Sequence, residues 1–338
     1  MLTKGNIKRT MLNYAIYLIM LVMIIVIIAI EPSFLSLTQV SNILAQSSSR
    51  IIIALGVGGI IILGGTDLAA GRMVGMSAVI TASLLQSVES SLRIYKDMPR
   101  LPVIVPILLA MVVCGVFSLI HGFFVAKLKV APFIASLGIQ QVVYGLFSIY
   151  FQNANGAAPI GSLDPAFTTF AQKNFFIGGE NGFRLPLIVL YAALFTLLTW
   201  FIWNKTKIGK NMYAIGGNTE SATVCGVNIV AGILIIYTIA GLYYGFAGAL
   251  EAARTGSVTN ALGEGYQMDA IAACVVGGVS MRGGIGKVSG VVTGVIMFQI
   301  INYGMNYIGV NPYLQYVVKG VIILIAVSID TQKYLKKK

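Results

Sequence analysis

The sequence predicts an all-α polytopic membrane protein of about ten transmembrane helices, with an internal repeat and both termini in the cytoplasm. The composition, the apolar runs and the placement of basic residues support this prediction. Of 338 residues, 57% are hydrophobic and 10% are charged, and the mean hydropathy is +0.87. At about 20 apolar residues per helical span, roughly ten spans fit and little is left for a soluble part. We therefore expect one transmembrane domain over residues 1–338.

Apolar runs separated by polar segments place the individual spans. The first run is longer than a signal-peptide core and ends without a small-residue cleavage site, so we expect an uncleaved first span. The predicted spans are 14–30, 45–63, 71–88, 102–126, 131–150, 185–203, 229–251, 266–279, 288–307 and 313–329.

Basic residues set the predicted orientation. With a cytoplasmic N-terminus, the inner segments hold about twice as many Lys and Arg residues as the outer ones, as the positive-inside rule requires. The formal net charge of +12 is therefore attributed to topology. We expect lipid around the chain and no nucleic-acid partner.

Two loops are long enough to have functions of their own. The outer loop, about 151–184, is too short for a domain and is expected to be a docking surface or lid. In the inner loop, about 204–228, Asn218 suits a helix N-cap, Glu220 suits the first turn and Gly226 suits the C-terminus. A short cytosolic helix is predicted there, and the residues alone leave open whether it binds a partner.

A glycine-rich break follows the second span. The run 51–63 would form only about 20 Å of helix, against a hydrocarbon core of about 30 Å. Either the helix begins near Leu44 and buries Ser47, Ser48 and Ser49, or it is a broken helix that stops inside the protein.

A similar break in the second half, over 273–294, predicts an internal repeat, which the span count makes parallel and one miscounted span would make inverted. Paired glycine-interrupted segments point to a transport pathway. The alignment pairs Gly64 and Gly65 with Gly277 and Gly278, and Gly71, Arg72 and Gly75 with Gly286, Lys287 and Gly290.

Asp67 is expensive inside a bilayer and should lie at the break. We expect it to cap the helix that starts near Leu68, while Arg72 anchors the cytosolic side; a position beside the pore is the alternative. Glycines at helical spacing predict close helix contacts. These are Gly71 and Gly75, Gly241 and Gly245, and Gly286, Gly290 and Gly294.

Several chemistries are excluded. The stretch GGIGKVSG fails as a phosphate-binding loop because Met281 and Val288 occupy positions that need glycine and Ser or Thr. If transport uses ATP, another polypeptide must bind it, and no cofactor or metal is expected here. The single histidine, His121, allows no histidine-containing triad or histidine-based metal site and is expected to be packed rather than a proton relay. No catalytic residues are predicted, and the chain is not expected to be an enzyme.

Other polar residues have two interpretations each. The cysteines have no paired spacing and are expected to be small buried residues: Cys114, Cys225 and Cys274. Ion pairing at the membrane surface, or less favourably a coupling-ion site, is expected for Glu251, Arg254, Glu264 and Asp269. Core packing, or contact with a pyranose ring, is expected for Tyr237, Tyr243 and Tyr244.

Four stretches carry a resemblance over about residues 40–330. They are GGTDLAAG, GGNTESATVCGVNI, GGVSMRGGIGKVSGVVTGV and INYGMNYIGVNPYLQYVVKG. The sequence resembles permease subunits of bacterial ABC importers for monosaccharides, of the ribose and galactose type. The resemblance implies a pore for galactose or methyl galactoside in the bacterial inner membrane, formed by two copies of the chain.

It further implies an extracytoplasmic sugar-binding protein and a cytosolic ATPase subunit with two fused cassettes. Site roles follow by resemblance. The coupling helix to the ATPase would comprise Gly216, Gly217, Asn218, Glu220, Ala222 and Gly226; the signature turn would comprise Asp67, Leu68 and Gly71, with Gly277 and Gly278 in the second break. The family usually has serine where Ala69 stands, so a serine hydroxyl is not essential there. An ion-coupled secondary sugar transporter using Asp67, Glu251 or Asp269 remains the alternative.

Overall fold

The computed structural model describes residues 20–177 and 182–335, and this part of the chain is mostly helical. Six helices are long and apolar enough to cross a membrane by length and composition. They are α2 (Leu37–Ile62), α4 (Ile104–Ala126), α5 (Pro132–Asn155), α7 (Leu187–Lys205), α10 (Ile229–Thr255) and α12 (Val288–Tyr307). Shorter apolar helices are Met20–Ile30, α3 (Ala70–Leu84), α11 (Tyr266–Val276) and the described apolar part of α13 (Pro312–Leu335).

Every predicted span overlaps one of these helices, although the start of the first, 14–19, lies outside the described residues. The terminal basic residues that entered the charge comparison, within 1–19 and 336–338, also lie outside them. A short 3-10 helix, η1 (Pro32–Leu35), connects Met20–Ile30 to α2. The polytopic helical architecture is therefore as the sequence predicts.

The structure decides between the two interpretations of the serine-rich stretch. α2 is one continuous helix of 26 residues, and Ser47, Ser48 and Ser49 are buried in it. The hydroxyls of Ser47 and Ser48 donate to backbone carbonyls one turn back. This pairing removes most of the cost of burying them.

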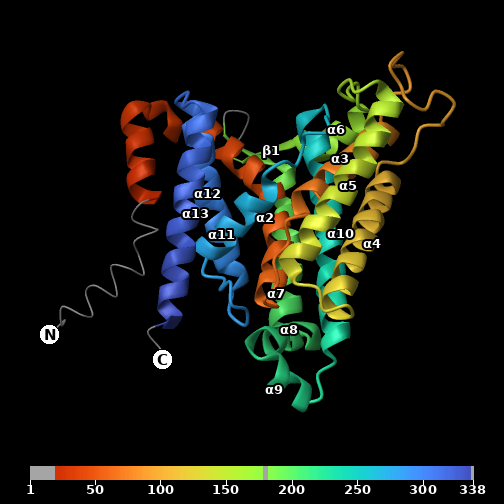
Figure 1. Ribbon diagram of the computed structural model, residues 1–338. Helices are drawn as coiled ribbons and strands as arrows, with labels where there is room; N and C mark the ends of the chain where they lie inside the picture. Colours follow the sequence, from red (N-terminus) through yellow and green to blue (C-terminus); the bar gives the residue numbers. More distant parts are fainter. Residues whose placement is uncertain (1–19, 178–181, 336–338) are drawn as a thin grey trace.

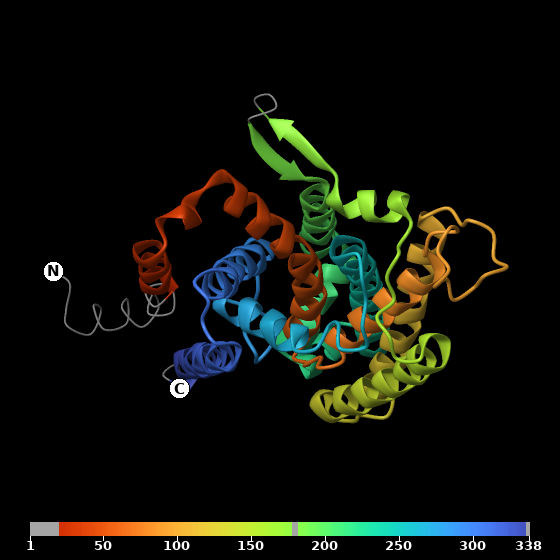
Figure 2. The same cartoon turned by 90° about the horizontal axis from the view of Figure 1, so that it is seen from above.

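The prediction of an all-α chain is wrong in one place. Residues Asn174–Ile177 (β1) and Phe183–Pro186 (β2) pair as an antiparallel hairpin, preceded by the short helix α6 (Pro165–Gln172). The sequence predicts a loop over this stretch because it is polar and aromatic; residues 178–181 lie outside the described chain. Figures 1 and 2 show the hairpin at one end of the molecule, projecting away from the helices.

The opposite end carries α8 (Lys207–Gly217) and α9 (Thr219–Val224). Between the two ends, α10 packs against α4, α3 and α2, and Figure 2 shows α12 and α13 on the other side from α4 and α5. α2 is buried over 83% of its apolar stretch, against 28% for α5 and α7. α2 therefore belongs to the core, while α5 and α7 face outward.

Small residues bring the core helices close together. A methyl group at Gly241 would meet the backbone of Cys114, and one at Gly245 would meet the backbone of Met111 on α4. Gly290 and Gly294 similarly pack against the backbone of α11 and its end. These glycines behave as predicted for membrane helices, where close van der Waals contact replaces hydrophobic drive. Gly71 and Gly75 meet the backbone of loop residues 262–263, and their helix neighbours, Gln267 on α11 and Phe147 on α5, approach them through side chains rather than backbone.

Candidate functional site

The predicted inner helix is present as α9. The Oδ1 atom of Asn218 accepts a hydrogen bond of 2.7 Å from the backbone N–H of Ser221, which is the N-cap arrangement. Glu220 lies in the first turn. Gly226 follows the C-terminus with φ +79°, and its N–H donates to the carbonyl of Thr223 at 2.9 Å. The local structure is confirmed, while its docking role stays a prediction.

α9 presents an open surface. Val224 is 89% exposed, and Glu220 and Ser221 are exposed beside it. Ala222 is buried and holds the opposite side of α9 against the protein. An exposed apolar side chain on a short, well-capped helix suits a docking surface.

The two glycine breaks have the same backbone geometry. At the end of α2, Gly64 has φ +84° and the N–H of Gly65 donates to the carbonyl of Ile60. At the end of α11, Gly278 has φ +85° and the N–H of Val279 donates to the carbonyl of Cys274. Both are glycine-terminated helix ends of the Schellman type, which need a left-handed residue.

This geometry corrects the predicted alignment by one residue. Gly64 corresponds to Gly278, because these two positions have the positive φ. The alignment had paired Gly64 with Gly277, since adjacent glycines cannot be distinguished by residue type. The end of α2 and the loop after α11 both contact α8, so the two helices point toward the same end of the molecule and the handedness that the sequence left open is parallel.

The breaks touch each other and α8. The N–H of Gly284 donates to the carbonyl of Ile62 at 2.8 Å. A side chain at Gly216 would overlap both of these backbone groups. The hydroxyl of Tyr213 on α8 donates to the carbonyl of Gly286 at 2.9 Å. We call Ile62, Gly216, Gly283 and Gly284 the glycine junction.

Asp67 lies at the break as expected, but it does not cap α3, whose N-cap position is occupied by Ala69 without a side-chain hydrogen bond. Its Oδ1 atom accepts a 2.9 Å hydrogen bond from the N–H of Ala69, just before α3. Asp67 is fully buried, and the same oxygen lies 3.7 Å from Nδ1 of His121 on α4, which is also fully buried. The prediction of a packed histidine is thus confirmed. Its approach to Asp67 could not be predicted from the sequence, because 54 positions separate the two residues along the chain.

 

Arg72 lies elsewhere than predicted. Its guanidinium is 3.6 Å from a carboxylate oxygen of Glu264 and 4.1 Å from the ring centre of Tyr144. Glu264 belongs to the loop between α10 and α11, at the end of the molecule that carries the hairpin. α3 is only 15 residues long, about 22 Å, and starts well inside the bundle. Arg72 therefore does not anchor the α8 end.

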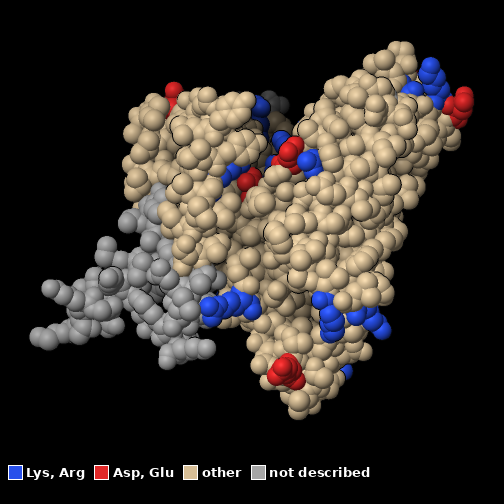
Figure 3. Space-filling model, viewed as in Figure 1, with Lys and Arg blue, Asp and Glu red and all other residues tan. Residues whose placement is uncertain are grey.

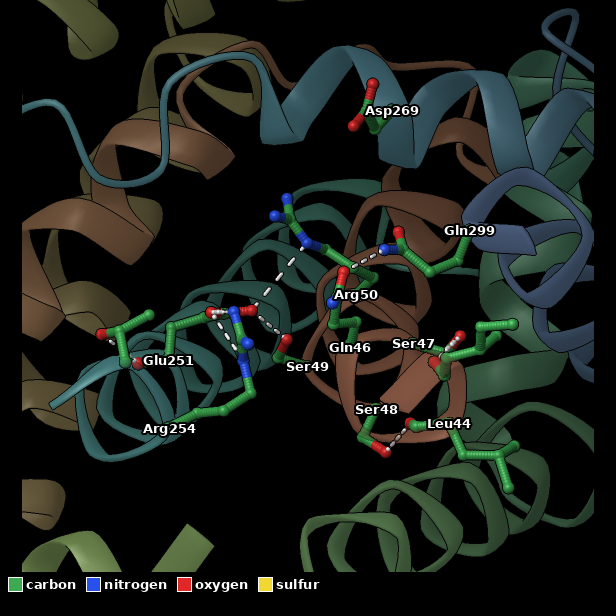
Figure 4. Close-up of polar contacts among 12 residues, drawn as sticks. Leu44, Gln46, Ser47, Ser48, Ser49, Arg50, Glu251, Arg254, Asp269 and Gln299 are labelled. Carbon is green, nitrogen blue, oxygen red and sulfur yellow. Dashed lines mark hydrogen bonds and ion pairs between the residues drawn. The ribbon is translucent and has the colours of Figure 1, made fainter. Parts of the chain in front are cut away.

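A polar cluster joins α2, α10 and α11 (Figure 4). Glu251 is fully buried, accepts a hydrogen bond from the Ser49 hydroxyl, and pairs with Arg254 at 2.7 Å. Arg50 lies 3.9 Å from the same carboxylate, with its guanidinium 3.0 Å from the ring centre of Tyr266. The predicted ion pairing of Glu251 and Arg254 is confirmed.

Further polar side chains border this cluster. Gln299 on α12 donates to Gln46 on α2 at 3.0 Å, and Lys319 on α13 donates to Asp269 on α11 at 3.2 Å. Figure 3 shows acidic and basic side chains gathered in a hollow on this face. The sequence does not predict that Gln46, Arg50 and Gln299 form a group. Isolated polar residues within apolar runs were the available signal.

The three candidate aromatic residues are buried. Tyr237 packs edge-on against His121, with ring centres 4.7 Å apart, and Tyr244 is fully buried. The Tyr243 hydroxyl lies 2.9 Å from the Thr199 hydroxyl. Their contact with a sugar stays a prediction. Cys114 and Cys274 are buried as expected, whereas Cys225 is exposed, so that prediction is wrong for Cys225.

At the hairpin end, an ion pair between Arg100 and Asp164 fixes the position of α6. Asp164 caps α6 through the N–H of Ala166 at 2.8 Å and accepts two hydrogen bonds from Arg100, at 2.7 and 2.8 Å. Burial by itself would raise the pKa of Asp164, but the bonds from Arg100 and Ala166 outweigh it and lower that pKa. Asp164 therefore stays ionised and holds α6 to the segment before α4.

The chain is similar to known transport permeases over most of its length. The model of a family described as "Branched-chain amino acid transport system / permease component" matches residues 39–327. The galactose/methyl galactoside import permease protein MglC of Haemophilus influenzae is 53% identical over 324 residues, covering 96% of this chain and 95% of that one. MglC of Escherichia coli is 51% identical over 335 residues, 98% of each chain. The ribose import permease protein RbsC of Bacillus subtilis is 33% identical over 304 residues, covering 90% and 88%. No solved structure matches the chain.

Proposed function

The chain belongs to the branched-chain amino acid transport system / permease component family, and from this premise we propose that it forms the membrane pathway of an importer for galactose and methyl galactosides. It is a permease subunit of an ABC sugar importer and a multi-pass protein of the bacterial inner membrane. The observation that carries the choice of sugar is the identity of 53% and 51% to two galactose/methyl galactoside permeases, against 33% to a ribose permease.

The proposed topology has ten spans and places α8 and α9 in the cytosol. Lys205, Lys207 and Lys210 at this end support that orientation, because cytosolic loops are rich in lysine and arginine. Both termini are then cytosolic, and α6 and the hairpin face outward. A second copy of the chain completes the pore, and the hollow in Figure 3 is the face that we assign to it.

The proposed partners bind at opposite ends. A cytosolic ATPase subunit with two cassettes binds ATP and receives α9, so this chain needs no cofactor and performs no hydrolysis. An extracytoplasmic sugar-binding protein delivers sugar to the hairpin end. When the ATPase closes, α8 moves with α9, and the glycine junction passes the displacement to α2 and α11. Transport is then alternating access driven from the cytosolic end.

Reconstitution in liposomes tests this proposal. The chain alone should accumulate no labelled galactose with any ion gradient. The chain with the ATPase subunit and the binding protein of the same genome should accumulate galactose when ATP is supplied. Uptake by the chain alone against a sugar gradient would favour the ion-coupled transporter and contradict the proposal.

A further inference from the structure

The β1–β2 hairpin exposes a row of apolar side chains. Phe175, Phe176 and Ile177 of β1 are 41%, 52% and 56% exposed. Residues that pair directly across a hairpin share a face, and the faces alternate along each strand. The register therefore makes one face entirely apolar, formed by Phe175, Ile177, Phe183 and Leu185. A two-stranded hairpin is only marginally stable in water, so such a face needs a cover.

The hairpin is attached at the end of α7. β2 ends at Pro186, and α7 begins at Leu187, whose N–H donates to the carbonyl of Lys173 at 2.7 Å. The 19 residues of α7 span about 28 Å, close to the thickness of a hydrocarbon core. α7 therefore needs its whole length to cross the membrane, and both strands meet it at the membrane surface. Figure 2 shows the hairpin projecting sideways from this point, beyond the helices.

The helix that carries the hairpin faces lipid. Only 28% of the apolar stretch of α7 is buried, and Leu190 and Leu194 are among its exposed residues. At the far end of α7, Nζ of Lys205 lies 5.6 Å from the ring centre of Trp200, a pairing typical of the membrane–water interface. The apolar face of the hairpin is thus continuous with a surface that the bilayer already covers.

Two basic side chains accompany the exposed aromatic rings of β1. Nζ of Lys173 lies 5.9 Å from the ring centre of Phe175, and the guanidinium carbon of Arg184 lies 5.6 Å from that of Phe176. Lys173 and Arg184 are exposed, and among the described residues neither has a carboxylate within ion-pair distance. Long cationic side chains beside apolar surface extend their charges toward the headgroups of a bilayer.

We propose that the hairpin lies in the headgroup layer of the bilayer, with its apolar face toward the acyl chains and with Lys173 and Arg184 on lipid phosphates. The partner is an anionic phospholipid surface. This assignment goes beyond the proposed function, because it holds whichever sugar is carried. Anchored in this way, the hairpin fixes the depth of α7 in the membrane.

A fluorophore on the hairpin tests contact with lipid. Cys225 is replaced by serine to remove the exposed thiol, Ile177→Cys is labelled with an environment-sensitive dye, and the full-length chain is placed in lipid nanodiscs. Phosphatidylcholine that carries a nitroxide on its headgroup should quench this dye at least about twofold more strongly than a dye at a control position in water.

Leu92→Cys is the matched control. Leu92 is apolar and 71% exposed, and it belongs to the segment between α3 and α4, which extends past the helix ends in Figure 1. A dye there should be quenched by iodide in the water and little by the nitroxide lipid. Lipid quenching at Ile177→Cys that is no stronger than at Leu92→Cys would overturn the inference.

Other occupants of the hairpin give different results, and each would also overturn the inference. Protection of the Ile177→Cys dye from both iodide and nitroxide lipid would mean that a second copy of the chain covers the face. Protection from iodide that appears only when the sugar-binding protein is added would mean that the hairpin docks a protein.

The charges are tested with the same dye. Adding anionic phosphatidylglycerol to the nanodisc, at a constant share of nitroxide lipid, should strengthen quenching about twofold, because two cations are attracted to the headgroup charge. Lys173→Gln combined with Arg184→Gln should abolish this increase, whereas Lys96→Gln, an exposed residue between α3 and α4, should leave it unchanged. An increase that survives the double substitution would overturn the role assigned to the two cations.

Discussion

The backbone N–H of Gly284 donates a 2.8 Å hydrogen bond to the carbonyl oxygen of Ile62, which joins the loop after α11 to the end of α2. The backbone of Gly216 on α8 lies against both groups. Three backbones can approach so closely only where side chains are absent. α8 is thus coupled to both breaks by direct backbone contact, without an intervening side chain.

Gly216→Ala should disturb this junction. The added methyl group would overlap the Ile62 carbonyl and the Gly284 amide, so α8 must move away at a cost of about 1–3 kcal/mol. Galactose uptake by the assembled importer should fall strongly, and the protein should melt at a lower temperature in detergent. Uptake assays and thermal unfolding check these outcomes.

Gly217→Ala is the matched control. No atom lies within 4 Å of a methyl group at Gly217, and the residue belongs to the same helix. Uptake and melting temperature should therefore stay close to wild type. An equal loss of uptake in the two variants would show that replacing any glycine at the end of α8 is harmful, and that the contact at the glycine junction is not the cause.

Glu220→Arg should disrupt docking of α9 on the ATPase. Glu220 is exposed in the first turn, where a carboxylate is favoured by the helix dipole and a cation is not. Membrane insertion should be normal, while ATP-dependent uptake should be largely lost. Co-purification with the ATPase subunit and sugar uptake are the measurements. Glu89→Arg makes the same charge change on an exposed residue at the opposite end, and it should bind the ATPase normally.

Local rules predicted those parts of the structure that depend on neighbours in sequence. The Asn218 cap of α9 uses a backbone N–H three residues away, and the hydrogen bond from the Ala69 N–H to Asp67 closes a turn before α3. Helix length against membrane thickness left burial of the serines in α2 as one of two alternatives, and the continuous 26-residue helix selects it. Such features are fixed by geometry within one or two turns.

Features that depend on tertiary contacts could not be predicted in the same way. The approach of His121 to Asp67 and of Glu264 to Arg72 requires knowledge of which helices pack together. The prediction placed Arg72 at the cytosolic side because it took α3 as a helix that crosses the whole membrane. In the structure, the turn at Asp67 occupies part of the membrane thickness, so α3 is shorter than a full span. The cluster around Arg50 draws on three helices and was therefore visible only as isolated polar residues.

Asp67 substitutions separate stabilisation of the turn before α3 from a role in transport. Asp67→Asn keeps an oxygen that can accept from the Ala69 N–H, whereas Asp67→Ala removes it and should destabilise the protein by about 0.5–1.5 kcal/mol, the net contribution of one hydrogen bond. We expect Asp67→Asn to fold with near-normal stability and to transport poorly, because its charge beside His121 is lost. Thermal unfolding and uptake are compared for both variants. Normal transport by Asp67→Ala would contradict a role next to the pathway.

Acid should weaken the attachment of α6 through the Arg100–Asp164 pair. The pKa of Asp164 is lower in the folded protein than the value of about 3.9 for a free aspartate. The pair therefore stabilises the fold above about pH 4, and this stabilisation is lost as the pH falls through the lowered folded pKa. Arg100→Gln should lower the melting temperature at pH 7 by a small amount, since Arg100 is exposed to screening solvent.

The difference between wild type and Arg100→Gln should shrink as the pH falls below about 4, because protonated Asp164 no longer attracts the guanidinium in either protein. Arg184→Gln provides a comparison at the same end of the molecule. Arg184 is exposed and has no carboxylate within ion-pair distance among the described residues, so its effect should not follow the titration of Asp164. A melting difference for Arg100→Gln that persists unchanged to pH 3 would mean that the contact acts through packing of the arginine stem rather than through charge.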